Sequence, residues 1–309
     1  MRLPGGTPKF ARDITVSRSF LGFILLSAAA CRTTPPAPGE LVDDTGARTA
    51  LAAPPRRIVS LIPATTELLF ALGAGDRVVG RTRYCDYPAE AARVPDLGNG
   101  IQPNVEAVVA ARPDLVLLYK SGADRGAADR LRGLGIPVLE LATDRIADMA
   151  RITRLLGRAL SVAETAESLV ARTQRDLDSA SAGAGSPAHR PTVFILAWDR
   201  PVMTLGQGSF LSEIIEHAGA RNLFADLPAS SAQVSIETIA ARDPDFILAT
   251  GAPDIAIAER PEWQVVRAMR EHRFVRVNGS EFNRPGPRVG QAVRELVAAL
   301  AAARATPPR

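Results

Sequence analysis

The sequence predicts an α/β protein with two Rossmann-like lobes, each built on a parallel sheet. One long backbone helix joins the lobes, and a ligand cleft lies between them. Apolar strands alternate with amphipathic helices along the chain, the pattern of a parallel sheet covered by helices. The same order of elements then occurs a second time. A length of 309 residues suits two lobes, since single cores rarely grow beyond ~250–300 residues.

The predicted N-terminal lobe, residues 56–160, starts with a β-branched strand at Arg57–Leu61. Thr65 or Thr66 then caps a helix that continues through Glu67–Leu72 and ends at the glycines after it. Val78–Val79 resumes extended structure. Later elements of this lobe are a capped helix with its following strand, a further strand and a closing helix: Asn104–Asp114, Leu115–Tyr119, Val138–Leu141 and Ile146–Ala159.

The predicted C-terminal lobe, residues 189–309, repeats this plan. Its elements are a strand, a helix, a capped helix and a strand: Thr192–Ala197, Phe210–His217, Ser235–Asp245 and Phe246–Ala249. The helix–Pro–Asp–strand block after Ser235 aligns residue for residue with the block after Asn104. Two copies of one strand–helix plan therefore predict two parallel sheets.

Residues 161–188 form the predicted inter-lobe segment. Ser161 is placed to cap a helix over Ala163–Ala180, and Ser181–Ala188 then consists of small and turn-forming residues. A single long helix is thus the ordered path between the lobes. We expect such a helix to restrict large lobe movements.

The first thirty residues are predicted to be a signal peptide. Arg12 and Arg18 precede the apolar run Phe20–Ala30, which is too short to span a bilayer and ends in small residues. Cys31 follows, as in the lipobox of bacterial lipoproteins, which predicts a lipid anchor; ordinary cleavage with a free Cys31 is the alternative. Residues 31–55, rich in Thr, Pro, Gly and Ala, then form a flexible linker. The predicted location is the periplasm, as a membrane-anchored lipoprotein.

The charge of the chain gives little support to a nucleic-acid partner. The formal net charge is +4, but residues 1–30 hold four basic residues against one acidic residue. The remainder therefore carries only +1. We expect no nucleic-acid binding from this composition.

Several segments together resemble the helical-backbone substrate-binding proteins of ABC importers, and most of all the vitamin B12-binding members. These segments are Arg57–Leu72, Val79–Ala91, the two capped helices and the tail Phe282–Arg288. The resemblance implies capture of a corrinoid, cobalamin or cobinamide, and its delivery to an ABC permease dimer with its ATPase. A ferric siderophore or haem is the alternative ligand. A stand-alone enzyme on this fold is the alternative of another class.

A cleft at the carboxyl ends of the strands would be lined by loops. These loops contain much of the chain's small number of aromatic residues. A macrocyclic ligand needs such apolar faces, although each aromatic residue could equally serve packing. Arg284 and Arg288 flank a Pro-Gly-Pro turn and either cap it or bind polar ligand groups. The predicted ligand-binding residues are Ala64, Thr65, Tyr84, Tyr119, Trp198, Phe282, Asn283, Arg284 and Arg288. Gly100 and Ser231 stand where B12-binding relatives offer tryptophan.

Glu106 and Glu237 occupy equivalent places in the two repeats. Each falls in the first turn of a capped helix, where a carboxylate favours the helix dipole. The family resemblance implies a second role, in which the two carboxylates dock equivalent arginines of a permease dimer. Such charge pairs contribute orientation and association rate more than affinity.

The sequence lacks the constellations expected of an enzyme or a metal site. Ser60 and Ser209 have no recognisable base nearby, and GxSxG is absent. His189, His217 and His272 form no metal-spaced pair. We expect neither catalysis nor a resident cofactor or metal. With Cys31 lipidated, Cys85 is expected to be a buried thiol, with ligation of cobalt or iron as the lesser alternative.

Overall fold

The computed structural model describes residues 40–120, 126–184, 190–250, 257–277 and 279–305. The predicted signal peptide, Cys31, the first part of the linker and His189 lie outside these residues. Pro36–Arg309 forms one compact unit. Within the described ranges, no helix is both long and apolar enough to cross a membrane.

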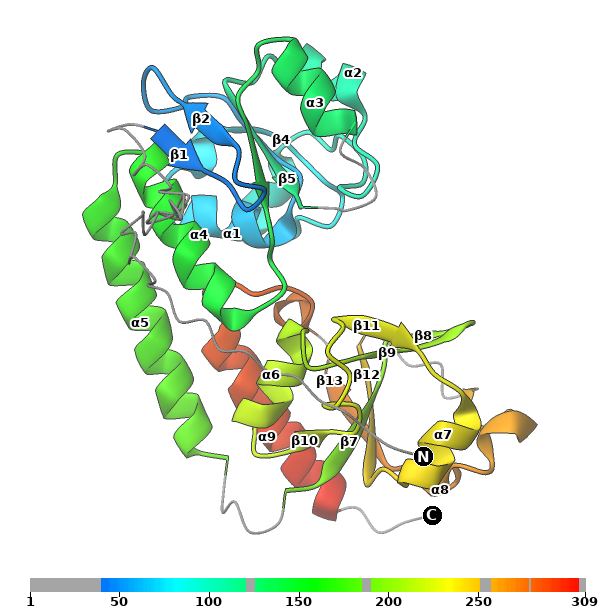
Figure 1. Cartoon of the computed structure of the whole chain (residues 1–309). Coiled ribbons are helices and arrows are strands. Elements are labelled where there is room, and N and C mark those ends of the chain that lie inside the picture. The colour runs from blue at the N-terminus through cyan, green and yellow to red at the C-terminus, as the bar shows by residue number, and fades with distance from the viewer. Residues whose placement is uncertain (1–39, 121–125, 185–189, 251–256, 278, 306–309) are drawn as a thin grey trace, which may run out of the picture. The chain divides into compact units, whose positions relative to one another are not determined.

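The N-terminal lobe is a four-stranded parallel sheet with helices on both faces (Figure 1). Its strands lie in the order β4 (Val78–Arg81), β3 (Ile58–Ser60), β5 (Leu115–Tyr119) and β6 (Val138–Leu141). Helices α1 (Pro63–Ala71) and α4 (Ile146–Ala159) cover one face, and α2 (Val105–Ala110) and α3 (Gly126–Gly133) cover the other. Leu115 and Leu117 face the first core, and Val116 and Leu118 face the second. Burial on both faces explains why these strands are apolar throughout.

The C-terminal lobe has a second four-stranded parallel sheet. Its strands lie in the order β10 (Arg221–Asn222), β7 (Thr192–Leu196), β12 (Phe246–Thr250) and β13 (Phe274–Val277). Helices α6 (Phe210–His217) and α9 (Val289–Ala305) bury one face. On the other face, Phe194 and Trp263 pack among residues near α7 (Ile236–Arg242) and α8 (Arg267–Arg270).

The prediction of two parallel sheets is confirmed, and several predicted elements coincide with the structure, including β5, β6, α4 and α6. The predicted caps of the two repeated helices are also confirmed. Asn104 Oδ1 accepts a hydrogen bond from the Ala107 N–H at 3.0 Å, and Ser235 Oγ accepts one from the Thr238 N–H at 3.2 Å. A small antiparallel sheet was not predicted: β11 (Ser231–Gln233), β9 (Val202–Leu205) and β8 (Trp198–Asp199).

The long inter-lobe helix is α5 (Ala163–Ala182), which packs against α4 and then against α9 (Figure 1). Leu169 belongs to the core of the N-terminal lobe, and Leu177 belongs to that of the C-terminal lobe. The prediction that Ser161 caps this helix is wrong. Its φ of 60° places it in the turn before the helix, and Val162 is the N-cap without a side-chain bond.

The prediction that Thr65 or Thr66 caps the first helix is also wrong. Helix α1 begins at Pro63, whose fixed φ suits the first helical position, and Ile62 is its N-cap. Thr65 and Thr66 lie inside the helix, and their hydroxyls donate to the Ile62 carbonyl at 3.0 and 3.2 Å.

Part of the predicted flexible linker is folded. Strands β1 (Glu40–Val42) and β2 (Arg48–Ala50) form an antiparallel hairpin. The buried Asp43 carboxylate accepts from the Glu140 N–H at 3.1 Å and from Arg132 Nη2 at 3.0 Å. The flexible-linker prediction is therefore wrong for residues 40–50, because polar contacts to the first lobe hold a segment with few apolar residues. Short 3-10 helices among the described residues are Gly75–Arg77, Ala89–Arg93, Pro261–Trp263 and Ser280–Phe282.

Candidate functional site

An apolar cavity of about 190 Å³ opens where β3 and β5 end. Its lining comes from the start of α1, from the loops after β4, and from the segment just before α9. Residues from both halves of the chain thus meet here, at the carboxyl ends of parallel strands. Five predicted ligand-binding residues line it: Ala64, Tyr84, Tyr119, Asn283 and Arg284.

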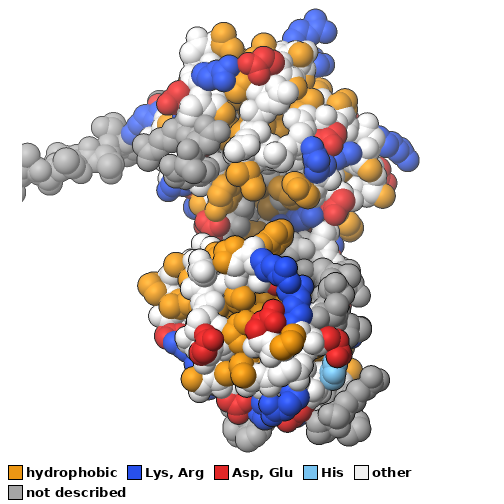
Figure 2. All heavy atoms as spheres, turned by 90° about the vertical axis from the view of Figure 1, so that its right-hand side faces the viewer, with side chains coloured by type: hydrophobic (Ala, Val, Ile, Leu, Met, Phe, Trp, Pro, Cys, Tyr) orange, Lys and Arg blue, Asp and Glu red, His pale blue; other side chains and the backbone are white. Residues whose placement is uncertain are grey.

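A larger cavity of about 680 Å³ adjoins the first. The two share Pro63, Tyr84, Asn283 and Arg284, so these residues form a common wall. The larger cavity is otherwise lined mainly by polar residues and glycine: Arg83, Asp86, Gly279 and Ser280. Together the two cavities form a cleft with one apolar part and one polar part. Figure 2 shows hydrophobic side chains along the hollow that crosses one face of the molecule.

Large apolar side chains are unusually exposed around the apolar cavity. Ile101, Tyr84 and Tyr119 are 76%, 58% and 38% exposed, although apolar residues of this size are mostly buried elsewhere. Asn99 Oδ1 accepts from the N–H groups of Ile101 and Gln102 at 3.1 and 2.7 Å, which holds the loop in place. An exposed apolar patch on such a loop is typical of a binding surface.

Ile101 was not among the predicted ligand-binding residues. The Asn99-Gly100 pair before it is a turn signal that marks the loop, but nothing in the sequence indicates that the loop lies beside Tyr119. Gly100 lines the cavity itself, and a Cβ on it would lie 2.1 Å from the Leu61 carbonyl oxygen. A tryptophan at this position would therefore require the backbone to move.

Tyr119 is held by a carboxylate at the edge of the cavity. Its hydroxyl donates to Asp144 Oδ1 at 2.6 Å. Burial and this hydrogen bond raise the pKa of Tyr119 well above its usual value of 10. The phenol is therefore a neutral apolar face in the cleft at physiological pH.

Arg284 is only 7% exposed and lies on the wall between the apolar and the polar part of the cleft. Its Nη2 donates to the Tyr84 carbonyl at 3.1 Å, and its Nη1 lies 3.0 Å from Asp86 Oδ1. The geometry to Asp86 makes an ion pair without a hydrogen bond. Neither Nη1 nor Nε has a hydrogen-bond partner among the described residues. Buried guanidinium groups rarely leave N–H donors unused.

Arg288 was predicted to contact ligand, but it does not line either cavity of the cleft. It forms two hydrogen bonds to the buried Glu67, of 2.9 and 3.0 Å, and a short ion pair with the buried Glu281. The centroid of the Tyr87 ring lies 3.7 Å from the guanidinium carbon of Arg288. Arg288 therefore joins α1 to the segment that precedes α9.

Three other predicted ligand residues also lie outside the two cavities. Thr65 is fully buried, and its hydroxyl lies 2.8 Å from that of Ser60. Phe282 is packed in the core beneath α9. Trp198 is 63% exposed on β8, and its Nε1 donates to the Arg200 carbonyl at 2.9 Å.

Cys85 is a buried free thiol. Its Sγ lies 3.1 and 3.2 Å from the hydroxyls of Thr66 and Thr82. It lines neither cavity of the cleft. The described part of the chain contains no cluster of three or more His, Cys, Asp or Glu side chains that could hold a metal ion.

Glu106 and Glu237 are exposed in the first turns of α2 and α7. Glu106 pairs with Arg130 at 2.9 Å. Backbone N–H groups at the helix start lower the pKa of both carboxyls below the usual 4.5, with Arg130 contributing at Glu106 and Ser235 at Glu237. Both carboxylates are thus charged and accessible near neutral pH.

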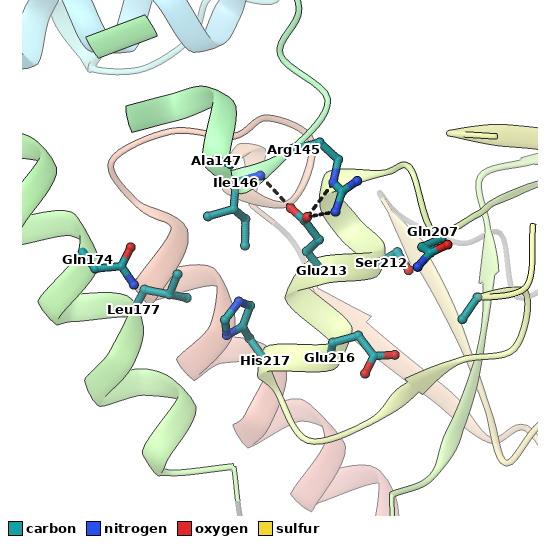
Figure 3. A pocket seen from close by; sticks show the side chains of 11 residues that line it. Arg145, Ile146, Ala147, Gln174, Leu177, Gln207, Ser212, Glu213, Glu216 and His217 are labelled. Atoms are coloured by element: carbon teal, nitrogen blue, oxygen red, sulfur yellow. Dashed lines mark hydrogen bonds and ion pairs between the residues drawn. The ribbon is translucent and has the colours of Figure 1, made fainter. Parts of the chain in front are cut away.

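A third cavity, of about 670 Å³, lies between the start of α4, α5 and α6 (Figure 3). Glu213 projects from α6, accepts the Ile146 N–H at 2.6 Å and pairs with Arg145. Near the end of α6, His217 Nδ1 lies 2.9 Å from Ser181 Oγ on α5. Glu213 therefore connects the first turn of α4 to the C-terminal lobe.

Residues 58–280 match the periplasmic binding protein family. A substrate-binding lipoprotein of an ABC transporter from Bacillus subtilis (strain 168) is 32% identical, over 80% of each chain. The periplasmic vitamin B12-binding protein of Vibrio cholerae has a solved structure with a TM-score of 0.69 and 27% identity, which covers 82% of this chain and 99% of its own. A periplasmic haem-binding protein of Roseiflexus sp. RS-1 gives a TM-score of 0.73 and 25% identity, over 80% and 98% of the two chains.

Proposed function

The chain belongs to the periplasmic binding protein family, and on that premise we propose that it captures a corrinoid and delivers it to an ABC permease dimer with its ATPase. Its Bacillus subtilis relative is a substrate-binding lipoprotein of an ABC transporter, which supports a role in ABC import. The choice of a corrinoid depends on the cleft. It also depends on the similarity to the vitamin B12-binding protein of Vibrio cholerae.

The observation that carries the ligand proposal is the apolar wall of Ile101, Tyr84 and Tyr119 around the smaller cavity. A broad macrocycle can cover all three side chains at once, and each buried apolar Å² contributes about 25 cal/mol. A corrinoid brings its own axial ligands to cobalt. Neither cavity of the cleft is lined by a described His, Cys or Met.

Haem is the second candidate, and Tyr84 is the observation that favours it. Haem iron is held in proteins by an axial His, Cys, Met or Tyr. The raised pKa of Tyr119 disfavours the tyrosinate form there, so it would be a poor iron ligand. Tyr84 is more exposed and lines both cavities, which makes it the available axial ligand in the described cleft.

Delivery to a permease requires an exposed surface on each lobe. Glu106 and Glu237 supply one exposed carboxylate each, at equivalent places of the two repeats. We place the docking contacts with arginines of the permease there. A lipid anchor on Cys31 would hold the protein at the membrane, as the lipoprotein relative suggests.

Calorimetry and absorbance titration with cobalamin, cobinamide, haem and a ferric siderophore test the ligand. We expect one corrinoid to bind per chain, and Ile101→Ala to weaken binding about tenfold through lost apolar burial. Leu134→Ala is the matched control, because Leu134 is similarly exposed but lines neither cavity of the cleft nor the cavity between α4, α5 and α6. Binding of haem or the siderophore without corrinoid binding would overturn the corrinoid assignment. Turnover without stable binding would instead favour an enzyme.

A further inference from the structure

We propose that the larger cavity of the cleft is a subsite for an anionic arm of the ligand, and that Arg83 selects this arm. The inference rests on the proposed function only in requiring that a ligand occupies the adjoining apolar cavity. It adds the chemical class of the ligand group that the larger cavity takes. Arg83 was not among the predicted ligand residues.

The two cavities offer opposite chemistry to one ligand. The smaller cavity presents mainly the apolar faces of Ile101, Tyr84 and Tyr119, where a charged group would lose hydration. The one charged side chain in its described lining, Arg284, lies on the wall that it shares with the larger cavity. The larger cavity is lined by Arg83, Asp86 and Ser280. Because the cavities share a wall, a ligand whose macrocycle covers the apolar side chains of the first can extend a polar arm into the second.

The charges of the larger cavity favour an anion. Arg83 is exposed, and its guanidinium has no ion-pair or hydrogen-bond partner among the described residues. Arg284 is buried in the wall, with Nε and Nη1 lacking hydrogen-bond partners. The carboxylate of Asp86 also lines the cavity, but it lies 3.0 Å from Arg284 Nη1 and is balanced by it. The three side chains together leave one positive charge, on Arg83.

Other polar groups of this cavity are consistent with the same ligand group. Asn283 is exposed on the shared wall, and its side chain has no described hydrogen-bond partner. The Ser280 hydroxyl already accepts from Arg288 Nη2 at 3.0 Å and keeps its own proton to donate. A guanidinium, an amide and a hydroxyl together suit a phosphodiester or a carboxylate. Cobalamin carries a phosphodiester in its nucleotide loop, cobinamide lacks it, and haem carries two propionates.

Titrations of the full-length protein with cobalamin and cobinamide, using Arg83→Gln and Arg83→Lys, test the subsite. We expect Arg83→Gln to weaken cobalamin binding about tenfold, the loss of one charge-assisted hydrogen bond. Cobinamide affinity should stay unchanged. Arg83→Lys should restore part of the cobalamin affinity, because it keeps the charge. Arg93→Gln is the control: Arg93 is exposed nearby in sequence, lines neither cavity of the cleft and should change nothing.

Equal losses for cobalamin and cobinamide, or no loss for either, would overturn the inference while leaving the corrinoid function intact. If neither corrinoid binds the wild-type protein, the corrinoid function fails, and haem and its dimethyl ester replace them as probes. Arg83→Gln should then weaken binding of haem but not of the ester, which lacks the anionic carboxylates. Equal effects on both, or no binding of any of the four probes, would overturn the inference as well.

Discussion

Arg288 Nε lies 2.9 Å from Glu67 Oε1, and Arg288 Nη2 lies 3.0 Å from Glu67 Oε2, so one guanidinium holds both oxygens of a buried carboxylate. Glu67 lies on α1 of the N-terminal lobe, whereas Arg288 directly precedes α9 of the C-terminal lobe. The same arginine also forms an ion pair with the buried Glu281. Because α1 and the segment before α9 both line the apolar cavity, this contact fixes two of its walls relative to each other.

Replacing Arg288 with Gln should destabilise the protein by about 3–5 kcal/mol, because two buried carboxylates lose their cation. Urea unfolding measures this loss. Arg294→Gln is the matched control: Arg294 also pairs with a carboxylate, Asp176, but both side chains are well exposed, and the expected loss is below about 1 kcal/mol. Equal losses in the two variants would contradict the role assigned to Arg288.

Glu213 should control the local stability of the first turn of α4. It accepts the Ile146 N–H, one of the donors that a helix start leaves without an internal partner (Figure 3). We therefore expect Glu213→Ala to accelerate hydrogen exchange at the Ile146 amide. Glu216→Ala serves as the control, since Glu216 pairs with Arg190 and its carboxylate forms no described hydrogen bond or ion pair with α4. Unchanged exchange at Ile146 in Glu213→Ala would show that the contact does not hold this turn in solution.

Gly100 should tolerate no side chain. A Cβ there would lie 2.1 Å from the Leu61 carbonyl and 3.3 Å from Thr82 Cγ2, both of which belong to the cavity lining. We expect Gly100→Ala to cost about 1–3 kcal/mol of stability, as overpacking does, and to weaken ligand binding by shifting this wall. Gly133→Ala, at the end of α3 with nothing within 4 Å, should instead stabilise by about 0.4–1 kcal/mol. Thermal melts and ligand titration of both variants provide the comparison.

The sheets and most of the helices could be predicted because their signals are local. Uninterrupted apolar runs such as Leu115–Tyr119 indicate strands buried on both faces, and Asn104 and Ser235 cap helices through their own side chains. The hairpin at Glu40–Ala50 was missed because it depends on Asp43 meeting residues almost a hundred positions away. No local pattern carries that information.

The candidate site was predictable in part for the same reason. Loops at the carboxyl ends of strands must meet in this fold, which placed Tyr84, Tyr119 and Asn283 in one cleft. The direction of each side chain depends on tertiary partners that sequence spacing does not reveal. Arg284 and Arg288 lie four residues apart, yet the first lines the cleft and the second is drawn to Glu67.

The docking role of Glu106 and Glu237 can be tested separately from their role at the helix starts. In the double variant Glu106→Gln and Glu237→Gln, we expect normal ligand affinity but weakened binding to the permease, with a smaller dependence on salt. Glu164→Gln is the matched control: Glu164 is an exposed carboxylate in the first turn of α5, outside the two repeated helices. It should leave permease binding unchanged.

The helix-start role of these carboxylates has its own pH signature. Their pKa values are lowered in the folded protein, so the stability they contribute is present above about pH 4.5 and is lost as the pH falls through the lowered values. Wild type and double variant should therefore differ most in stability above pH 4.5 and converge in acid. If the double variant binds the permease normally while showing this stability difference, the two glutamates serve only their helices. If the double variant loses ligand affinity in proportion to its loss of uptake, the two glutamates do not lie on a docking surface.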